Sequence, residues 1–175
     1  TLKGVFSVSR WFSQEKPGET ARILSLAVAA LLELGVSEPE RHILLASSNN
    51  IATLIVARQP FSQNDLTTLN ETISHYQFGM FVHPSSESSF KLFESIITAN
   101  TRSELEEYTS HQEYDLSPST DDRPYFFNQL PLNKPLEVMS VIQSLLAQGK
   151  ELGGVLYGNL VATATLLFLF VLSMI

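Results

Sequence analysis

The sequence predicts an α/β segment that runs to about residue 151, followed by a membrane-spanning helix. Three observations support this prediction. Residues 5–11 alternate in the manner of a strand, and an apolar run with helical periodicity follows from Glu19. Two short apolar runs, separated by turn-forming residues, then indicate a hairpin. The last 24 residues, 152–175, contain no charged residue and no histidine.

The uncharged run at 152–175 is long enough to cross the hydrocarbon core of a bilayer, which takes roughly 20 residues. A buried core helix is the alternative, but soluble helices of this length usually keep a polar stripe. A cleaved signal peptide is excluded because it would lie at the N-terminus. The chain opens on Thr1 without an initiating Met and closes inside this run, so we expect a fragment of a larger integral membrane protein.

The first strand and the first helix are separated by a turn. The strand ends near Arg10, and Pro17 with Gly18 marks the turn. The helix pattern that follows, to Leu34, is apolar on every face except one narrow stripe. That stripe consists of Arg22, Ser25, Ala29 and Glu33. Such a helix is expected to be covered on most sides, as it would be on a sheet, and Gly35 is well placed as its cap.

The next elements are a hairpin, a helix and a strand. Apolar runs at 42–46 and 52–57 flank Ser47-Ser-Asn-Asn50, which predicts an antiparallel hairpin. Ser62, with Asp65 three residues later, predicts the start of a helix. Four residues at helical spacing form the expected inner face of this helix: Leu66, Leu69, Ile73 and Tyr76. A strand is expected at 78–82.

The remainder of the segment combines short helices with a long loop. Helical spacing begins again close to Ser89, and Ser103 is a candidate cap of another short helix. Periodicity is lost at 111–131, where three consecutive aromatics at 125–127 favour an ordered loop that is docked on the domain. Helical spacing returns at 136–148, which predicts an amphipathic helix on the bilayer surface or against the domain.

These patterns divide the chain into a domain at 1–131, a juxtamembrane helix at 132–151 and a truncated transmembrane helix at 152–175. The net charge of −7 and the pI near 5.0 argue against a nucleic-acid partner, which would need clustered Lys and Arg. Zero cysteines exclude disulfides and thiolate metal sites and are compatible with a reducing compartment. We expect the domain to face the cytoplasm, although the few cations near the membrane run leave the topology open.

The sharpest candidate site is the cluster Asp121, Asp122 and Arg123, which lies in a proline-bounded loop. Paired carboxylates could hold a cationic amine or a metal, or one of them could accept a proton. The alternative is structural, with Asp121 closing a turn and Arg123 forming a surface or interdomain ion pair.

A second candidate site lies where the first strand ends. Arg10 and Trp11, beside Ser7 and Ser9, would be close to the sheet edge at which open α/β folds bind ligands. The alternative is a structural cation and a core or lid aromatic. The four histidines lack metal-ligand spacing, and no phosphate loop, nucleophile elbow or zinc-protease motif occurs. No residue is assigned as catalytic.

The order of these motifs resembles the carboxyl-terminal half of the spermidine-synthase-like proteins that are fused to membrane helices. The matching residues are the strand 4–11, the helix opening Glu19-Thr-Ala-Arg22, the hairpin, and the stretch 116–127 with its Thr-Asp-Asp-x-Pro element. This family is similar to class I S-adenosylmethionine-dependent transferases, whose core is a doubly wound, Rossmann-like sheet ending in an antiparallel hairpin. The resemblance implies that 5–10 is the fifth strand and that 42–57 carries the last two.

The resemblance also implies that the cofactor site is incomplete in this chain. The glycine-rich loop, the ribose-binding acid and the aspartate-bearing loop belong to upstream elements. S-adenosylmethionine or decarboxylated S-adenosylmethionine would bind the full-length protein, for aminopropyl or methyl transfer, and no cofactor would bind this fragment. The implied partners are a lipid bilayer and the missing amino-terminal half of the domain. The alternative is a non-catalytic sensing or scaffolding domain of a multi-helix membrane protein.

Overall fold

The computed structural model describes residues 4–14, 17–112, 114–122, 124, 126 and 154–173. The chain divides into two compact units, 1–111 with 116–118, and 112–115 with 119–175. The fold class is α/β, as predicted, with one four-stranded sheet and, among the described residues, five α-helices and one short 3-10 helix (Pro39–His42). The sheet belongs to the first unit, and helix α6 (Gly154–Ser173) belongs to the second.

All neighbouring strands of the sheet are antiparallel, in the order β1-β3-β2-β4. The strands are β1 (Val5–Trp11), β2 (Ile43–Ser48), β3 (Ile51–Ala57) and β4 (Gly79–Val82), so each predicted strand and the hairpin are confirmed. The first strand pairs with the second strand of the hairpin, placing Trp11 opposite Ile51. Consequently β1 and β2 run parallel to each other and are separated by β3.

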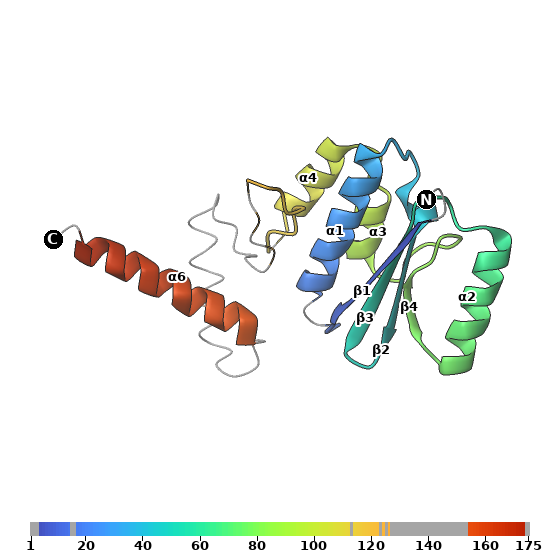
Figure 1. Cartoon of the computed structure of the whole chain (residues 1–175), viewed down its shortest axis with the longest axis horizontal. Coiled ribbons are helices and arrows are strands. Elements are labelled where there is room, and N and C mark those ends of the chain that lie inside the picture. The colour runs from blue at the N-terminus through green and yellow to red at the C-terminus, as the bar shows by residue number, and fades with distance from the viewer. Residues whose placement is uncertain are drawn as a thin grey trace. The chain divides into compact units, whose positions relative to one another are not determined.

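Helix α1 (Gly18–Glu33) connects β1 to β2 and packs on one face of the sheet together with α3 (Lys91–Ile97) and α4 (Arg102–Ser110), as Figure 1 shows. The helix predicted before Gly35 is therefore confirmed. Apolar side chains that are almost inaccessible to solvent form the core on this side: Leu24, Val28, Leu45, Leu54, Val82, Phe93, Ile96 and Leu105. Burial of this apolar surface is the main stabilising contribution to the unit.

The buried side of α1 is not the one that the sequence pattern predicted. Arg22, Ser25 and Ala29, expected on a narrow polar stripe, are buried, whereas Leu26 is exposed. The polar groups are compensated locally, since the Ser25 hydroxyl donates to the Ala21 carbonyl oxygen at 3.0 Å. Helices α3 and α4 pack against α1, so the amphipathic pattern of α1 did not identify its solvent-exposed side.

Gly35 ends α1 as predicted. Its φ angle of +80° lies in the left-handed region, which glycine adopts without steric cost. The Gly35 and Val36 amides donate to the carbonyl oxygens of Leu32 and Leu31, each at 3.0 Å. This pattern satisfies carbonyl groups that the end of a helix would otherwise leave without partners.

Helix α2 (Gln63–Tyr76) lies on the opposite side of the sheet from α1 (Figure 1). The predicted cap is confirmed, because the Asp65 amide donates to the Ser62 hydroxyl oxygen at 3.3 Å and the Ser62 amide to an Asp65 carboxylate oxygen at 2.9 Å. The predicted inner face is wrong in part: Leu66 is buried, but Tyr76 is 63% exposed. Helix α2 therefore covers this face incompletely.

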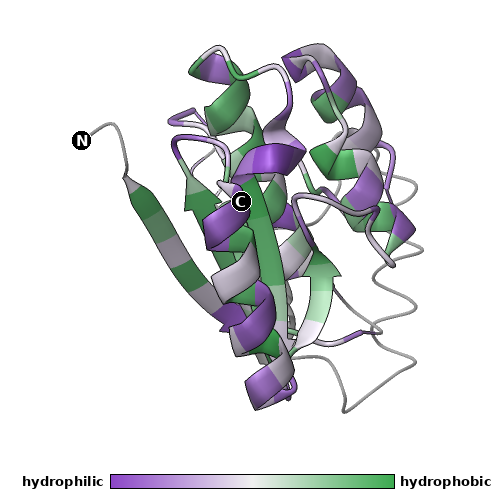
Figure 2. Cartoon of the chain, turned by 90° about the vertical axis from the view of Figure 1, so that its right-hand side faces the viewer, coloured by the Kyte–Doolittle hydropathy of each residue, from purple (hydrophilic) through white to green (hydrophobic). Residues whose placement is uncertain are grey.

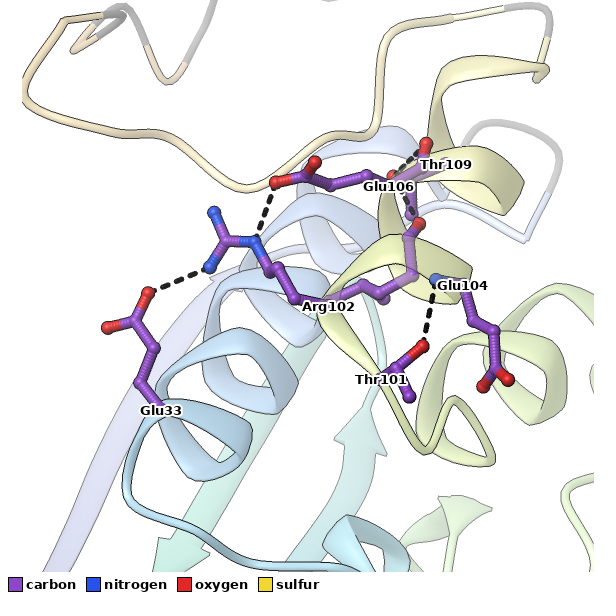
Figure 3. Close-up of polar contacts among 7 residues, drawn as sticks. Glu33, Thr101, Arg102, Glu104, Glu106 and Thr109 are labelled. Carbon is purple, nitrogen blue, oxygen red and sulfur yellow. Dashed lines mark hydrogen bonds and ion pairs between the residues drawn. The ribbon is translucent and has the colours of Figure 1, made fainter.

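At the surface, Arg102 of α4 forms one ion pair with α1 and a second one within α4 (Figure 3). Nη1 of Arg102 lies 3.0 Å from Oε1 of Glu33, and its Nε lies 2.7 Å from Oε1 of Glu106. Exposed pairs of this kind contribute little stability, so their main effect is to orient α4. The cap of α4 is Thr101, which accepts a hydrogen bond from the Glu104 amide at 3.2 Å, and not Ser103 as predicted.

Several predictions concern the region after residue 111. Arg123, Tyr125, Phe127 and the proposed juxtamembrane helix lie outside the described residues. The uncharged run at 152–175 does contain a helix, the 20-residue α6. Within the part of the chain that the structure describes, no helix has both the length and the apolar character needed to cross a membrane.

Candidate functional site

Arg10 and Trp11 are the last residues of β1, where they pair with Ala52 and Ile51. Consecutive strand residues point to opposite faces of a sheet, so these two side chains do not converge on one site. Trp11 is 74% exposed, which rules out a core position for it within this unit. Arg10 is half-buried and shares its face with the buried residue Ala52. Arg10 and Trp11 are therefore neighbours in the sequence, but their side chains lie on opposite faces of the sheet.

Within the described residues, β1 pairs with another strand along one side only, and on its outer side the Trp11 carbonyl oxygen accepts a hydrogen bond of 3.4 Å from the Thr20 hydroxyl. The Arg58 amide donates to the Gly4 carbonyl oxygen at 3.0 Å, and the Phe12 amide donates to the Asn50 carbonyl oxygen at 2.8 Å. Because antiparallel pairing alternates, even-numbered residues of β1 bond to β3 and odd-numbered ones point outward. The amide and carbonyl groups of Val5, Ser7 and Ser9 thus form the outer edge of the sheet.

Both faces of β1 are also poorly covered. Val5 is 64% exposed and Phe6, on the opposite face, is 61% exposed. Figure 2, which views the molecule from the side of α2, shows β1 at the margin of the sheet with no helix crossing in front of it. Ser7 and Ser9 are exposed, and the Ser9 hydroxyl is hydrogen-bonded to the Thr53 hydroxyl at 2.9 Å. An edge strand with exposed large apolar side chains is typical of a binding surface.

An aromatic cluster anchors the loop that follows β1. The ring of Phe12 lies 4.5 Å from that of Phe81, and Phe90 and Phe93 lie within 6.5 Å of Phe12. Such edge and tilted contacts add stability beyond their buried area. Sequence patterns did not identify Phe12 as a core residue, because it lies in a loop. The cluster fixes the position of the chain directly after Trp11.

Asp121 and Asp122 occupy an exposed turn in the second unit. Exposed carboxylates in a turn fit the structural alternative as well as a ligand-binding role. Their proposed partner Arg123 is outside the described residues, so the three-residue cluster is only partly visible. Among the described residues no group of three or more His, Cys, Asp and Glu side chains is arranged to hold a metal ion.

Two histidines have defined surroundings. Nδ1 of His42 is 3.0 Å from the Ala57 carbonyl oxygen, and the side chain is buried. Nδ1 of His83 accepts a hydrogen bond from the Ser85 amide at 3.2 Å. Burial lowers the pKa of His83 below its ordinary value of 6.5, because desolvation disfavours the charged form. Both histidines support the local backbone.

Comparison with known proteins gives no match, since no family model, no curated protein and no solved structure is similar to this chain. The resemblance to spermidine-synthase-like proteins therefore stays a prediction from the sequence. The structural feature with the clearest functional meaning is the uncovered edge of β1.

Proposed function

We propose that this chain forms the carboxyl-terminal half of a doubly wound, spermidine-synthase-like transferase domain that is attached to a lipid bilayer. The observation that carries this proposal is the outer edge of β1, where the backbone groups of Val5, Ser7 and Ser9 point away from the sheet. In the complete domain another strand pairs with this edge, and the sheet continues through β1.

The connection between the strands supports this arrangement. Strands β1 and β2 are parallel and are joined by α1, which is the connection that doubly wound sheets use. Strand β3 then closes the sheet as an antiparallel insertion between them. The order β1-β3-β2 is compatible with the expectation that residues 5–10 belong to the parallel part of a sheet and that 42–57 forms its terminal hairpin.

The side chains of β1 support the same role. Natural edge strands usually carry charges, prolines or bulges that prevent association with other strands. Val5 and Phe6 instead expose most of their apolar surface, and Ser7 and Ser9 are small enough to let a helix approach the sheet closely. A strand with these properties is stabilised by burial on both faces, as the interior strands of α/β sheets are.

Attachment to a bilayer is proposed for the whole uncharged run at 152–175, of which α6 is the described part. The described large side chains of α6 are mostly exposed, as the value of 67% for Leu166 illustrates. Large apolar side chains that are exposed in this way are unfavourable in water and favourable in hydrocarbon. Vesicle flotation tests this part: the full chain is expected to float with the lipid, and a variant ending at residue 151 is not.

The transferase activity is proposed for the full-length protein alone. This chain has no glycine-rich loop after a strand, so its own residues do not fit S-adenosylmethionine or its decarboxylated form. The exposure of Asp121 and Asp122 is also compatible with a second candidate, a non-catalytic scaffolding domain with the same fold. The two candidates differ in whether the complete domain binds the cofactor.

Titration calorimetry with both cofactors separates these candidates. We expect micromolar binding to the full-length protein and no measurable binding to residues 1–175. Binding to neither protein would leave the scaffolding function, whereas micromolar binding to residues 1–175 would contradict the assignment of this chain to the carboxyl-terminal half.

The pairing of β1 has its own test in the full-length protein. Ser7→Pro removes an outward amide without removing a hydrogen bond to β3, and it should lower the melting temperature if another strand pairs there. The matched variant Ser7→Ala retains the amide and should melt close to the wild type. Equal melting of the two variants would show that the edge stays unpaired.

A further inference from the structure

A cavity of about 160 Å³, partly open to solvent, lies between α2 and the sheet. The sheet contributes Ala46 and Ser48 of β2 and Thr53 and Ile55 of β3, and α2 contributes Leu69 and Ile73. This is the face of the sheet opposite α1. The cavity lies where α2 leaves this face incompletely covered. The apolar residues lining the cavity from α2 and β3 are half-buried and do not close on one another.

Helix α2 is held at its start by a hydrogen bond to the segment before β2, and at its end by β4, which begins at Gly79 and pairs with β2. At its start the Ser62–Asp65 capping box is formed, and the Phe61 amide donates to the Arg41 carbonyl oxygen at 3.1 Å. At its end Gln77 adopts a left-handed conformation, and the Phe78 amide donates to the Ile73 carbonyl oxygen at 3.0 Å. The small side chain of Ala46 lies on the sheet beneath a helix that is held in place from both sides.

The residues that line the cavity favour an uncharged ligand. Among the described residues, no Asp, Glu, Lys, Arg or His lines the cavity, so a charged ligand would lose its hydration without gaining an ionic partner there. The hydroxyls of Thr72 and Thr53 already bond to the Thr68 carbonyl oxygen and to Ser9. The exposed residue Ser48 supplies a hydroxyl at the rim, which suits a ligand with at most one polar group.

We propose that this cavity is a binding site for a small uncharged apolar molecule, a single aromatic ring or a short branched aliphatic group with at most one hydroxyl or carbonyl. The size follows from the volume, because an apolar cavity of about 150 Å³ accommodates benzene. The site depends on neither the transferase activity nor the bilayer attachment, since every residue that forms it belongs to the first unit.

Protein-observed NMR on the full chain in lipid nanodiscs tests the site with benzene as the probe. We expect saturable shifts of the Ile55 and Ile73 methyl resonances and none of the buried Ile96, which packs on the other side of the sheet. Ala46→Phe fills the cavity from the sheet and should weaken binding at least tenfold. Leu69→Phe fills it from the half-buried helix side and gives the same test if Ala46→Phe does not fold.

Thr67→Phe is the matched control, because it adds the same ring to an exposed position of α2 that does not line the cavity. It should bind benzene as the wild type does. Shifts that do not saturate, or that are unchanged in both cavity-filling variants, would show that benzene only partitions into the lipid and would overturn the proposal.

Discussion

Nε of Arg22 in α1 donates a hydrogen bond of 3.1 Å to the carbonyl oxygen of Ser117, 95 positions later in the chain. The guanidinium is almost completely buried, at 4% exposure, and a buried charge is stable only when its donors have acceptors. The neighbouring Leu116 is buried as well, and its amide donates to the Thr109 carbonyl oxygen at 3.3 Å. These contacts hold the segment 116–118 against α1 and α4.

Replacing this arginine should destabilise the first unit. Arg22→Met keeps most of the apolar stem but removes the charge-assisted hydrogen bond, and we expect the free energy of unfolding to fall by about 2 kcal/mol. Urea unfolding of the full chain in mild detergent measures the change. Arg58→Met, at an exposed arginine, is the control and should stay within about 0.5 kcal/mol. Equal effects of the two variants would show that the buried hydrogen bond is unimportant.

Truncating Phe12, in the aromatic cluster that follows β1, should lower the free energy of unfolding more than Arg22→Met does. Phe12 is buried and contacts three other rings, so Phe12→Ala should cost about 3–5 kcal/mol of unfolding free energy. Phe61→Ala, which truncates a half-buried phenylalanine outside the cluster, should cost clearly less. Differential scanning calorimetry of both variants checks the order, and a smaller loss for Phe12→Ala would contradict the packing.

Gly35 provides a test of backbone conformation without a change in packing. A Cβ atom at this position would meet no atom within 4 Å, yet φ is +80°. Gly35→Ala should therefore lower the unfolding free energy by about 1 kcal/mol through backbone strain alone. Gly35→Asn should be milder, because asparagine tolerates the left-handed region. A neutral Gly35→Ala variant in urea titrations would indicate that α1 ends differently in solution.

His83 should make stability depend on pH. Its folded-state pKa is lowered below 6.5, so the unfolded chain binds a proton more readily than the folded one. At pH 7.5 His83 is largely neutral in both states, and stability should fall as the pH decreases from about 6.5 towards the folded-state pKa. His83→Gln should reduce the difference between urea midpoints at pH 7.5 and 5.5, while the control Ser74→Gln, which introduces the same residue at an exposed position of α2, should not. An unchanged difference in the His83 variant would contradict this linkage.

Variants of the loop residues Asp122 and Arg123 distinguish a catalytic role from a structural role in the full-length protein. If Asp122 faces a substrate, Asp122→Asn should abolish turnover and leave the melting temperature within a few degrees. If it forms a structural ion pair with Arg123, Asp122→Asn and Arg123→Ala should mainly lower the melting temperature. Parallel activity and melting measurements decide between these roles. Unchanged activity in both variants would exclude the loop from catalysis.

The sequence by itself predicted each described strand and all five described α-helices within a few residues. Alternation in β1, the turn at the hairpin and the Ser62–Asp65 cap are local signals, because the residues that create them are close in sequence. The cap of α4 was placed two residues late, since Ser103 and Thr101 offer the same hydroxyl and only the helix geometry shows which one accepts the bond from Glu104.

Only the tertiary structure decided which surfaces are covered. Arg22, Ser25 and Ala29 of the expected polar stripe of α1 are buried because other elements pack over them, and Ser117, 95 positions after Arg22, accepts a hydrogen bond from it. Tyr76, the last residue of α2, is exposed although its helical spacing matches that of the buried Leu66. The pairing of β1 with β3, which leaves one edge open, depends on strands some 45 residues apart. Contacts across such separations are set by the packing of whole elements, and periodicity within one element carries no information about them.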